Sequence, residues 1–386
     1  MMTVPRTLAF VTHQYVRGRR LPVYPEPPAA RPTLALAAQV AMDEVVLAVM
    51  NNPRRYPRRR DYERVGQEVT DGLALYQARG WLEDPLSFHP EPVPLIDDLE
   101  IRVRGARGLA YEHITFASAY HPWEGEPGGD RWLDFELNRT AHAYVLRHPD
   151  GAPRPWLVCV HGFGTGHALM DFTGFRAAKL HRELGLNLAF PVVPLHGPRT
   201  SNRIGGLELM SFDMLNGVHG LAQSVADVRR VISWVRAQEP SPSVLGVYGI
   251  SLGGYIASLV AALEPGLDLV ITGIPAIDLP ALFAHHCPPA LRRRALEYGL
   301  LGEEVHRLHR VVSPLAVDPL VPRERRFIYA GLGDRMATPK QAYRLWQHWD
   351  EPRLAWYGGN HIGFMWSKET DRFVTGSLQS SGFIAA

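Results

Sequence analysis

The chain has 386 residues, which at about 100–200 residues per domain allows two or three domains, or one large domain with an extension. Hydrophobic residues make up 46% of it and charged residues 21%, so the composition excludes a disordered chain and a fibrous repeat. The formal net charge of +2 creates no global field that would attract nucleic acid, and we expect no nucleic-acid partner.

The N-terminal segment from Met1 to Tyr24 carries no apolar run that could form the core of a signal peptide, so we expect a cytoplasmic protein. The one long apolar stretch, Thr33 to Met50, contains Gln39, Asp43 and Glu44. Charged side chains in the middle of a bilayer span are costly, so this stretch predicts a packed helix and no membrane span.

Residues before Ile101 show no alternation of strands and helices. A proline-rich lead and the apolar helix are followed by an arginine cluster and a second helical pattern from Asp61 to Gly80. Pro85 to Pro94 then predicts a linker, because prolines lack a backbone donor and interrupt helices. We therefore assign residues 1–105 to an N-terminal helical extension and residues 106–386 to one large unit. The cluster is interpreted as a solvated turn rather than a patch for anionic surfaces, and it consists of Arg54, Arg55, Arg58, Arg59 and Arg60.

After Ile101 the pattern changes to alternating strands and amphipathic helices, which is typical of an α/β sheet. The strands that begin at Trp156 and Val244 are almost continuous apolar runs, as expected when helices cover both faces of a mostly parallel sheet. A helical, arginine-rich insertion, residues 278–313, interrupts the alternation between the sixth and seventh strands. The eight predicted strands are Glu112–Ser118, Ala141–Leu146, Trp156–His161, Leu186–Val193, Val244–Ile250, Leu267–Gly273, Arg326–Leu332 and Arg353–Tyr357.

A glycine-flanked serine stands at the end of the fifth predicted strand. The sequence reads Gly249-Ile250-Ser251-Leu252-Gly253 and runs directly into a helix-forming segment. In a strand-turn-helix elbow the serine has a strained backbone, and glycines are needed where a side chain would collide with the turn. The pentapeptide alone is a weak signal, but this context predicts that Ser251 is a nucleophile rather than a buried hydroxyl in a tight turn.

A glycine-rich turn, His161-Gly162-Phe163-Gly164-Thr165-Gly166, follows the third predicted strand. Such a turn leaves backbone N–H groups free to stabilise an oxyanion, and we expect the amides of Phe163 and Leu252 to be the donors. A phosphate-binding loop is the rival interpretation, but the lysine and hydroxyl pair of such loops is missing. His161 itself is expected to be a structural hydrogen bonder.

An acid and a base are expected further along the chain, each just past a strand. Asp334 follows the seventh predicted strand, and His361 follows the eighth. Parallel strands present their carboxyl ends along one edge of the sheet, so Ser251, Asp334 and His361 should converge there. Histidine suits the base because its pKa lies near neutrality, and the carboxylate fixes its tautomer. Asp278, past the sixth strand, is the alternative acid.

Other polar residues do not form a recognisable metal or redox site. Cys159 and Cys287 have no ligand spacing, and we expect two free thiols with no metal and no organic cofactor. His196 and Arg199 either face the crevice or stabilise a loop. Four histidines of the insertion lack acidic or thiolate companions at ligand spacing and are expected to line a pocket or lie on the surface: His285, His286, His306 and His309.

In these motifs the sequence, from about Glu112 to Phe364, resembles the α/β-hydrolase superfamily. The segment Pro194-Leu195-His196-Gly197-Pro198-Arg199 and the insertion look like bacterial esterases related to dienelactone hydrolases and prolyl-oligopeptidase catalytic domains. The resemblance implies an α/β-hydrolase fold for residues 106–386 and a catalytic role for this unit. Asn360 departs from the pattern, because a glycine or another small residue commonly precedes the histidine.

We expect hydrolysis of a carboxylic ester or a related acyl bond of a small-molecule substrate through an acyl-enzyme. Carbon-carbon bond hydrolysis or acyl transfer on the same three residues is one alternative, and a non-catalytic binding protein of the same fold is another. The N-terminal extension is expected to dock beside the insertion and help close the pocket, which would make bulky substrates poor ones. Packing on the back of the large unit, or a homodimer contact, is the alternative for it. Its helix is expected to bury the apolar face formed by Leu34, Leu36, Val40, Val45, Val46 and Val49.

Overall fold

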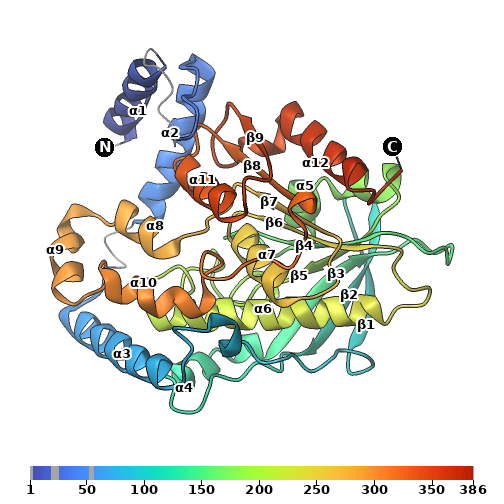
Figure 1. Ribbon diagram of the computed structural model, residues 1–386, viewed down its shortest axis with the longest axis horizontal. Helices are drawn as coiled ribbons and strands as arrows, with labels where there is room; N and C mark the ends of the chain where they lie inside the picture. The colour runs from blue at the N-terminus through green and yellow to red at the C-terminus, as the bar shows by residue number, and fades with distance from the viewer. Residues whose placement is uncertain (1–2, 19–25, 52–55, 386) are drawn as a thin grey trace.

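The computed structural model describes residues 3–18, 26–51 and 56–385, and Arg54 and Arg55 of the arginine cluster lie outside these residues. Within the described residues, nine strands form one sheet in the order β1-β2-β3-β5-β4-β6-β7-β8-β9 (Figure 1). The first three pairs of this order are antiparallel, and the pairs from β5 to β9 are parallel. The strands are β1 (Glu100–Ala106), β2 (Leu109–Ala117), β3 (Thr140–Leu146), β4 (Trp156–Val160), β5 (Asn187–Pro191), β6 (Leu245–Ile250), β7 (Leu269–Gly273), β8 (Arg326–Gly331) and β9 (Arg353–Tyr357).

The prediction of eight strands is wrong by one, because it missed β1. This strand lies at the edge of the sheet and pairs antiparallel with β2 along its whole length. Its residues are exposed apart from the half-buried Ala106, so the strand has no buried face. Ile101 and Val103 do alternate with charged residues, but this alternation is short and was not interpreted as a strand. The boundary predicted at residue 105 falls inside this strand.

Helices cover both faces of the sheet, as the apolar strands predicted. In β4, Val158 and Val160 pack into the larger core with helices α6 and α7, whereas Leu157 and Cys159 pack into a second core with α5 and α12. In Figure 1, α6 lies below the strands, and α5 and α12 lie above them. The helices of these two layers are α5 (Ala168–Gly174), α6 (Met214–Arg236), α7 (Leu252–Leu263), α11 (Pro339–His348) and α12 (Lys368–Ser380).

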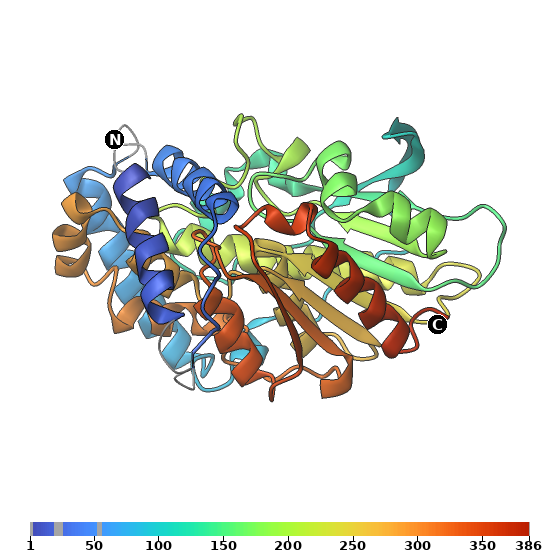
Figure 2. The ribbon, with the colours of Figure 1, turned by 90° about the horizontal axis from the view of Figure 1, so that it is seen from above.

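Three helices precede the sheet: α1 (Thr3–Arg17), α2 (Leu34–Met50) and α3 (Arg59–Ala78). The proline-rich lead therefore contains a helix that the sequence pattern did not indicate. Helices α1 and α2 pack against each other and lie side by side at one end of the molecule (Figure 2). Helix α3 packs instead on α6 and on the insertion, and its apolar face belongs to the larger core.

The segment predicted to be a linker is packed rather than free. It contains a short helical turn, Pro85–Phe88, whose terminal residues Pro85 and Phe88 are both buried. Phe88 stacks edge-on against Trp81 with ring centroids 5.2 Å apart. Prolines thus interrupted the helix as expected, but the apolar residues between them anchor the segment on the core.

The insertion between β7 and β8 is helical, as predicted, and consists of α8 (Leu279–His286), α9 (Pro289–Glu297), α10 (Glu303–His309) and a short turn at Arg310–Val312. None of the helices in the described part of the chain is both long and apolar enough to cross a membrane. The remaining short elements are α4 (Gly129–Leu133) and the turns at Glu136–Arg139, Lys179–Glu183, Gly197–Arg199, Arg323–Arg325 and Gly363–Met365.

Candidate active site

Ser251 stands in the sharp turn between β6 and α7, with φ +58° and ψ −117°. This conformation is strained for a residue with a side chain, and it persists because the surrounding backbone enforces it. A Cβ on Gly249 would lie 2.0 Å from the carbonyl oxygen of Gly253, and a Cβ on Gly253 would lie 1.9 Å from that of Val160. Both flanking glycines are therefore required by the close approach of the backbone.

The structure brings the three residues Ser251, His361 and Asp334 into one hydrogen-bonded chain. His361 Nε2 lies 3.0 Å from Ser251 Oγ, and His361 Nδ1 lies 2.7 Å from Asp334 Oδ2. The other oxygen of Asp334 accepts hydrogen bonds from the backbone amides of Met336 and Ala337, at 2.8 and 2.9 Å. These two bonds hold the carboxylate with its free oxygen toward the imidazole. The three side chains are buried.

The surroundings of His361 favour its protonated form. Burial lowers the pKa of this histidine, but the Asp334 carboxylate and, more weakly, the Asp43 carboxylate raise it, and the net pKa lies above the ordinary value of 6.5. A histidine with this geometry can accept a proton from a serine hydroxyl, because the imidazolium that forms is stabilised by the carboxylate on its other nitrogen.

Helix α2 holds both the turn that carries Asp334 and the turn that carries His361, which the sequence did not reveal. Asp43 Oδ2 accepts hydrogen bonds from the backbone amides of Arg335 and His361, both at 3.0 Å, and its Oδ1 accepts one from Asn360 Nδ2 at 2.9 Å. Burial and the nearby Asp334 carboxylate raise the pKa of Asp43 to about 6. The unusual signal in the sequence was a pair of acidic residues in an otherwise apolar helix.

The predicted buried face of α2 is consequently wrong at most positions. Leu36 and Val40 are buried, but four of the six apolar residues are exposed: Leu34, Val45, Val46 and Val49. The helix turns Asp43 and Glu44 inward instead, and Glu44 Oε1 lies 3.0 Å from Arg335 Nε. Because the helix is apolar on nearly all sides, hydrophobicity alone could not predict which of its faces is buried. The hydrogen bonds that Asp43 accepts from the two turns determine this face.

The turn after β4 lies directly over the elbow. A Cβ built on Gly162 would be 3.2 Å from Ser251 Cβ, so the next residue, Phe163, is close to the serine. Leu252 is the first residue of α7, where an amide has no acceptor within its own helix. Phe163 and Leu252 both line the cavity at Ser251. Their role as oxyanion donors remains a prediction.

His161 has a structural place in this turn, since its Nε2 accepts a hydrogen bond from the Val193 amide at 3.0 Å. Arg199 is buried and stabilises a loop. Its guanidinium lies 2.8 Å from Asp227 Oδ2 and 2.9 Å from the Val192 carbonyl oxygen. His196 is also fully buried, and its Nδ1 lies 2.8 Å from the carbonyl oxygen of Pro194.

The alternative acid, Asp278, does not contact His361 in the structure. It caps the N-terminus of α8 by accepting a hydrogen bond from the Ala281 amide at 3.0 Å, and it forms an ion pair with Arg344. Of the histidines in the insertion, His286 lines the cavity, with Nε2 2.9 Å from the Met336 carbonyl oxygen. Among the described residues, no group of three or more histidine, cysteine or acidic side chains is arranged to hold a metal ion.

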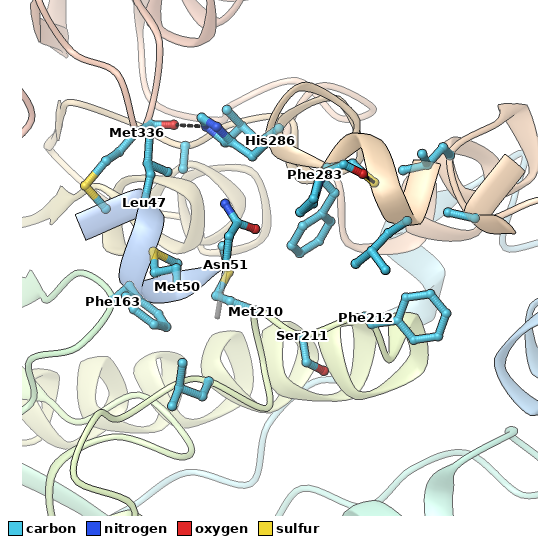
Figure 3. Close-up of a pocket in the computed structure, with 18 of the residues that line it drawn as sticks. Leu47, Met50, Asn51, Phe163, Met210, Ser211, Phe212, Phe283, His286 and Met336 are labelled. Carbon is cyan, nitrogen blue, oxygen red and sulfur yellow. Dashed lines mark hydrogen bonds between the residues drawn. The ribbon is translucent and has the colours of Figure 1, made fainter. Parts of the chain in front are cut away.

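The cavity beside Ser251 has a volume of about 320 Å³, within the range of about 300–1,000 Å³ typical of small-molecule sites. Its walls come from the end of α2, from the insertion and from the segment 207–214. In Figure 3, Leu47 and Met50 of α2 and Phe283 and His286 of α8 surround the same opening. The N-terminal extension and the insertion thus both contribute to this cavity.

Comparisons with known proteins identify relatives of this chain and a structure of similar fold. The chain is 47% identical over 360 residues to the uncharacterized protein MT2702 and 46% identical to the uncharacterized protein Rv2627c, from two strains of Mycobacterium tuberculosis, CDC 1551 / Oshkosh and ATCC 25618 / H37Rv. Each match covers 93% of this chain and 86% of the relative. Residues 213–290, which include the elbow, match the model of the X-Pro dipeptidyl-peptidase (S15) family.

A solved structure with a similar fold is an acetyl xylan esterase from Paenibacillus sp. R4, with a TM-score of 0.50 and 14% sequence identity. The match covers 72% of this chain and 93% of the esterase, and at this identity it concerns the fold alone. The chain therefore belongs to one family with the two mycobacterial proteins, and its fold is the α/β-hydrolase fold.

Proposed function

We propose that the protein hydrolyses a carboxylic ester through an acyl-enzyme formed on Ser251. The observation that carries this proposal is the hydrogen-bonded chain from Ser251 through His361 to Asp334, which opens on a cavity of substrate size. A strained serine, a base in contact with it and a carboxylate behind the base together form the arrangement that activates a hydroxyl for attack on a carbonyl group.

In the first step Ser251 Oγ attacks the carbonyl carbon of the ester, and His361 Nε2 accepts the hydroxyl proton. The amides of Phe163 and Leu252 stabilise the negative charge on the carbonyl oxygen. His361 then gives the proton to the leaving alkoxide, so that an alcohol departs and the acyl group remains on Ser251. A water molecule, deprotonated by His361, attacks the acyl-enzyme and releases the carboxylic acid. Asp334 keeps the imidazole in the tautomer that this proton transfer needs.

The lining of the cavity favours an ester over a peptide. Among its described residues there is no aspartate, glutamate, lysine or arginine. A peptidase that removes residues from a free amino terminus must bind an ammonium group, and a charge without a partner is costly to bury. A neutral ester carries no charge, so its binding in this cavity does not incur the cost of burying one.

Reaction with a fluorophosphonate probe tests the proposal, because only an activated serine reacts. We expect stoichiometric labelling of Ser251 in the wild-type protein and turnover of nitrophenyl esters. The Ser251→Ala variant should keep its fold, since alanine fits the elbow, and should lose both activities. Ester hydrolysis above background in this variant, or a wild-type protein that the probe does not label, would contradict the proposal. Release of nitrophenol without free acid, in the presence of an alcohol acceptor, would point to acyl transfer instead.

A further inference from the structure

The cavity beside Ser251 is walled by side chains from several distant segments of the chain. Figure 3 places Phe163, which belongs to the turn next to Ser251, on one side of the opening and Phe212 on the opposite side. Leu47 and Met50 at the end of α2 and the residues of the insertion close the space between them. The cavity therefore reaches from Ser251 and Phe163 to Phe212.

The walls of this pocket are mainly apolar, and its polar side chains include Asn51, Ser211 and His286. Leucine, methionine and phenylalanine side chains dominate the lining, and its described part carries no ionised aspartate, glutamate, lysine or arginine. A charged chain would lose its hydration here without gaining a side chain of opposite charge as a partner. An alkyl chain would bind favourably, because the removal of each methylene group from water can increase kcat/KM by up to about fourfold.

Resting on the proposed ester hydrolysis, we propose that the substrate carries an extended, uncharged, apolar acyl chain, which occupies the pocket between α2, the segment 207–214 and the insertion. The acyl group stays on Ser251 through both chemical steps, whereas the alcohol leaves after the first. A pocket closed by several segments suits the part of the substrate that remains bound.

A series of nitrophenyl esters from acetate to decanoate tests this inference. In the wild-type protein kcat/KM should rise by at least a hundredfold along the series. Leu291 of α9 lines the pocket, and Leu291→Trp should narrow it, so that kcat/KM for decanoate falls at least tenfold while acetate changes less than twofold. Leu296 lies on the same helix and is 53% exposed, so Leu296→Trp is a matched control that should change neither value.

Labelling by the fluorophosphonate probe separates the two proposals. A protein that is labelled at Ser251 but hydrolyses acetate as well as decanoate would overturn the acyl-chain inference and leave the nucleophile intact. The inference would also fail if Leu291→Trp lowered acetate and decanoate turnover equally. An unlabelled protein without esterase activity would instead contradict the proposed function itself.

A second inference rests on a different observation, the carboxylate of Asp43. This group is 2% exposed and accepts hydrogen bonds from the turn that carries Asp334 and from the turn that carries His361. It does not contact the imidazole ring, so it cannot take part in proton transfer directly. It is nevertheless the side chain through which α2 contacts both the turn of Asp334 and the turn of His361.

We infer that Asp43 is a positioning residue, which fixes the turns of Asp334 and His361 relative to each other. Its negative charge lies close to His361 and also favours the imidazolium form. A displacement of about 1 Å between reacting groups can cost on the order of a hundredfold in rate, so the positions of these turns matter for turnover. The charged and titratable groups around Asp43 are Asp334, His361, Arg335, Tyr357 and, on its own helix, Glu44.

The test compares Asp43→Asn with the full-length wild-type enzyme in kcat, KM and pH profile. We expect kcat to fall at least tenfold, KM for a short ester to stay within twofold, and the apparent pKa in kcat/KM to move to lower pH, because a charge that stabilises the imidazolium is gone. Val45, which is 52% exposed on the same helix, provides the control variant Val45→Ala. An unchanged pH profile would show a purely structural carboxylate and overturn the inference.

If Asp43→Asn does not fold, Gln39→Ala provides a second test. Gln39 Oε1 accepts a hydrogen bond from the Asn360 amide at 3.1 Å, so this variant loosens the same junction and keeps the Asp43 charge. We expect a lower kcat with the pH profile of the wild type. Wild-type kcat in Gln39→Ala would contradict positioning by α2, and so would a shifted pH profile, because the charge is still present.

Discussion

The side-chain nitrogen of Asn360 lies 2.9 Å from Asp43 Oδ1 and 2.8 Å from the carbonyl oxygen of Gln39. Asn360 directly precedes His361, at a position where related sequences commonly carry a small residue. Here the larger polar side chain has a reason to be present, because it reaches across to α2 and donates to two acceptors. Asn360, which departs from the superfamily pattern, therefore forms the hydrogen bonds that connect the turn of His361 to α2.

Replacement of Asn360 by alanine should weaken this junction. Asn360→Ala leaves Asp43 Oδ1 and the Gln39 carbonyl oxygen without the donor that they share, and an unpaired buried polar group costs about 1–3 kcal/mol. We expect the free energy of unfolding, measured with urea, to fall by about that amount, and kcat to fall with it. Val46→Ala, at an exposed position of α2, should change both quantities little. Wild-type stability in Asn360→Ala would show that the contact is not important.

The wild-type enzyme should lose activity as the pH falls through a value above 6.5. The Asp334 carboxylate and the Asp43 carboxylate outweigh the effect of burial and raise the pKa of His361. Only the neutral imidazole can accept the serine proton, so kcat/KM should be maximal at pH values above this pKa and decline below it. A pH profile of kcat/KM for one ester measures the value. A half-maximal point clearly below 6.5 would contradict the arrangement around His361.

The convergence of Ser251, His361 and Asp334 was predictable because it depends on local sequence patterns. Glycines around Ser251, and an acidic residue and a histidine each placed just after a strand, are visible in sequence, and parallel strands bring such positions to one edge of a sheet. The eight predicted strands all exist, and β4, β5, β6 and β7 are buried along their whole length, as their apolar runs predicted. The superfamily fold followed from this alternation of strands and helices.

The elements that the sequence concealed are those whose conformation depends on distant partners. Strand β1 has no buried face, and the orientation of α2 is set by Asp43 and its hydrogen bonds to two turns about 290 and 320 residues away. Helix α3 also joins the main core, where Tyr62 and Tyr76 are fully buried. Removal of the whole N-terminal extension would therefore open this core. Single substitutions in α2 and the insertion are a cleaner test of whether the extension helps to close the pocket.

The two candidate acids should behave differently when each is neutralised. Asp334→Asn removes the carboxylate 2.7 Å from His361 Nδ1 and leaves the histidine in the wrong tautomer, an effect of order 10⁴ on kcat in a well-studied triad. Asp278→Asn breaks an ion pair with Arg344 and keeps an acceptor for the cap of α8, so kcat should change little. Steady-state kinetics of the two variants on one ester decides. A slower Asp278 variant would transfer the role of the acid to that residue.

The close packing of the elbow predicts that alanine substitutions at two adjacent glycines have different effects. In Gly253→Ala the new methyl group would lie 1.9 Å from the Val160 carbonyl oxygen, a contact with backbone that no side-chain movement can relieve. In Gly254→Ala the nearest atom would be the Cβ of Pro275 at 3.2 Å, which a small shift accommodates. Both residues lie in α7, where alanine is otherwise preferred to glycine by about 1 kcal/mol.

Gly253→Ala should therefore be insoluble or unreactive toward the fluorophosphonate probe, because the elbow must move away from β4. Gly254→Ala should fold with a melting temperature near that of the wild type and react with the probe. Normal labelling of Gly253→Ala would mean that the serine does not stand on the close-packed turn described here.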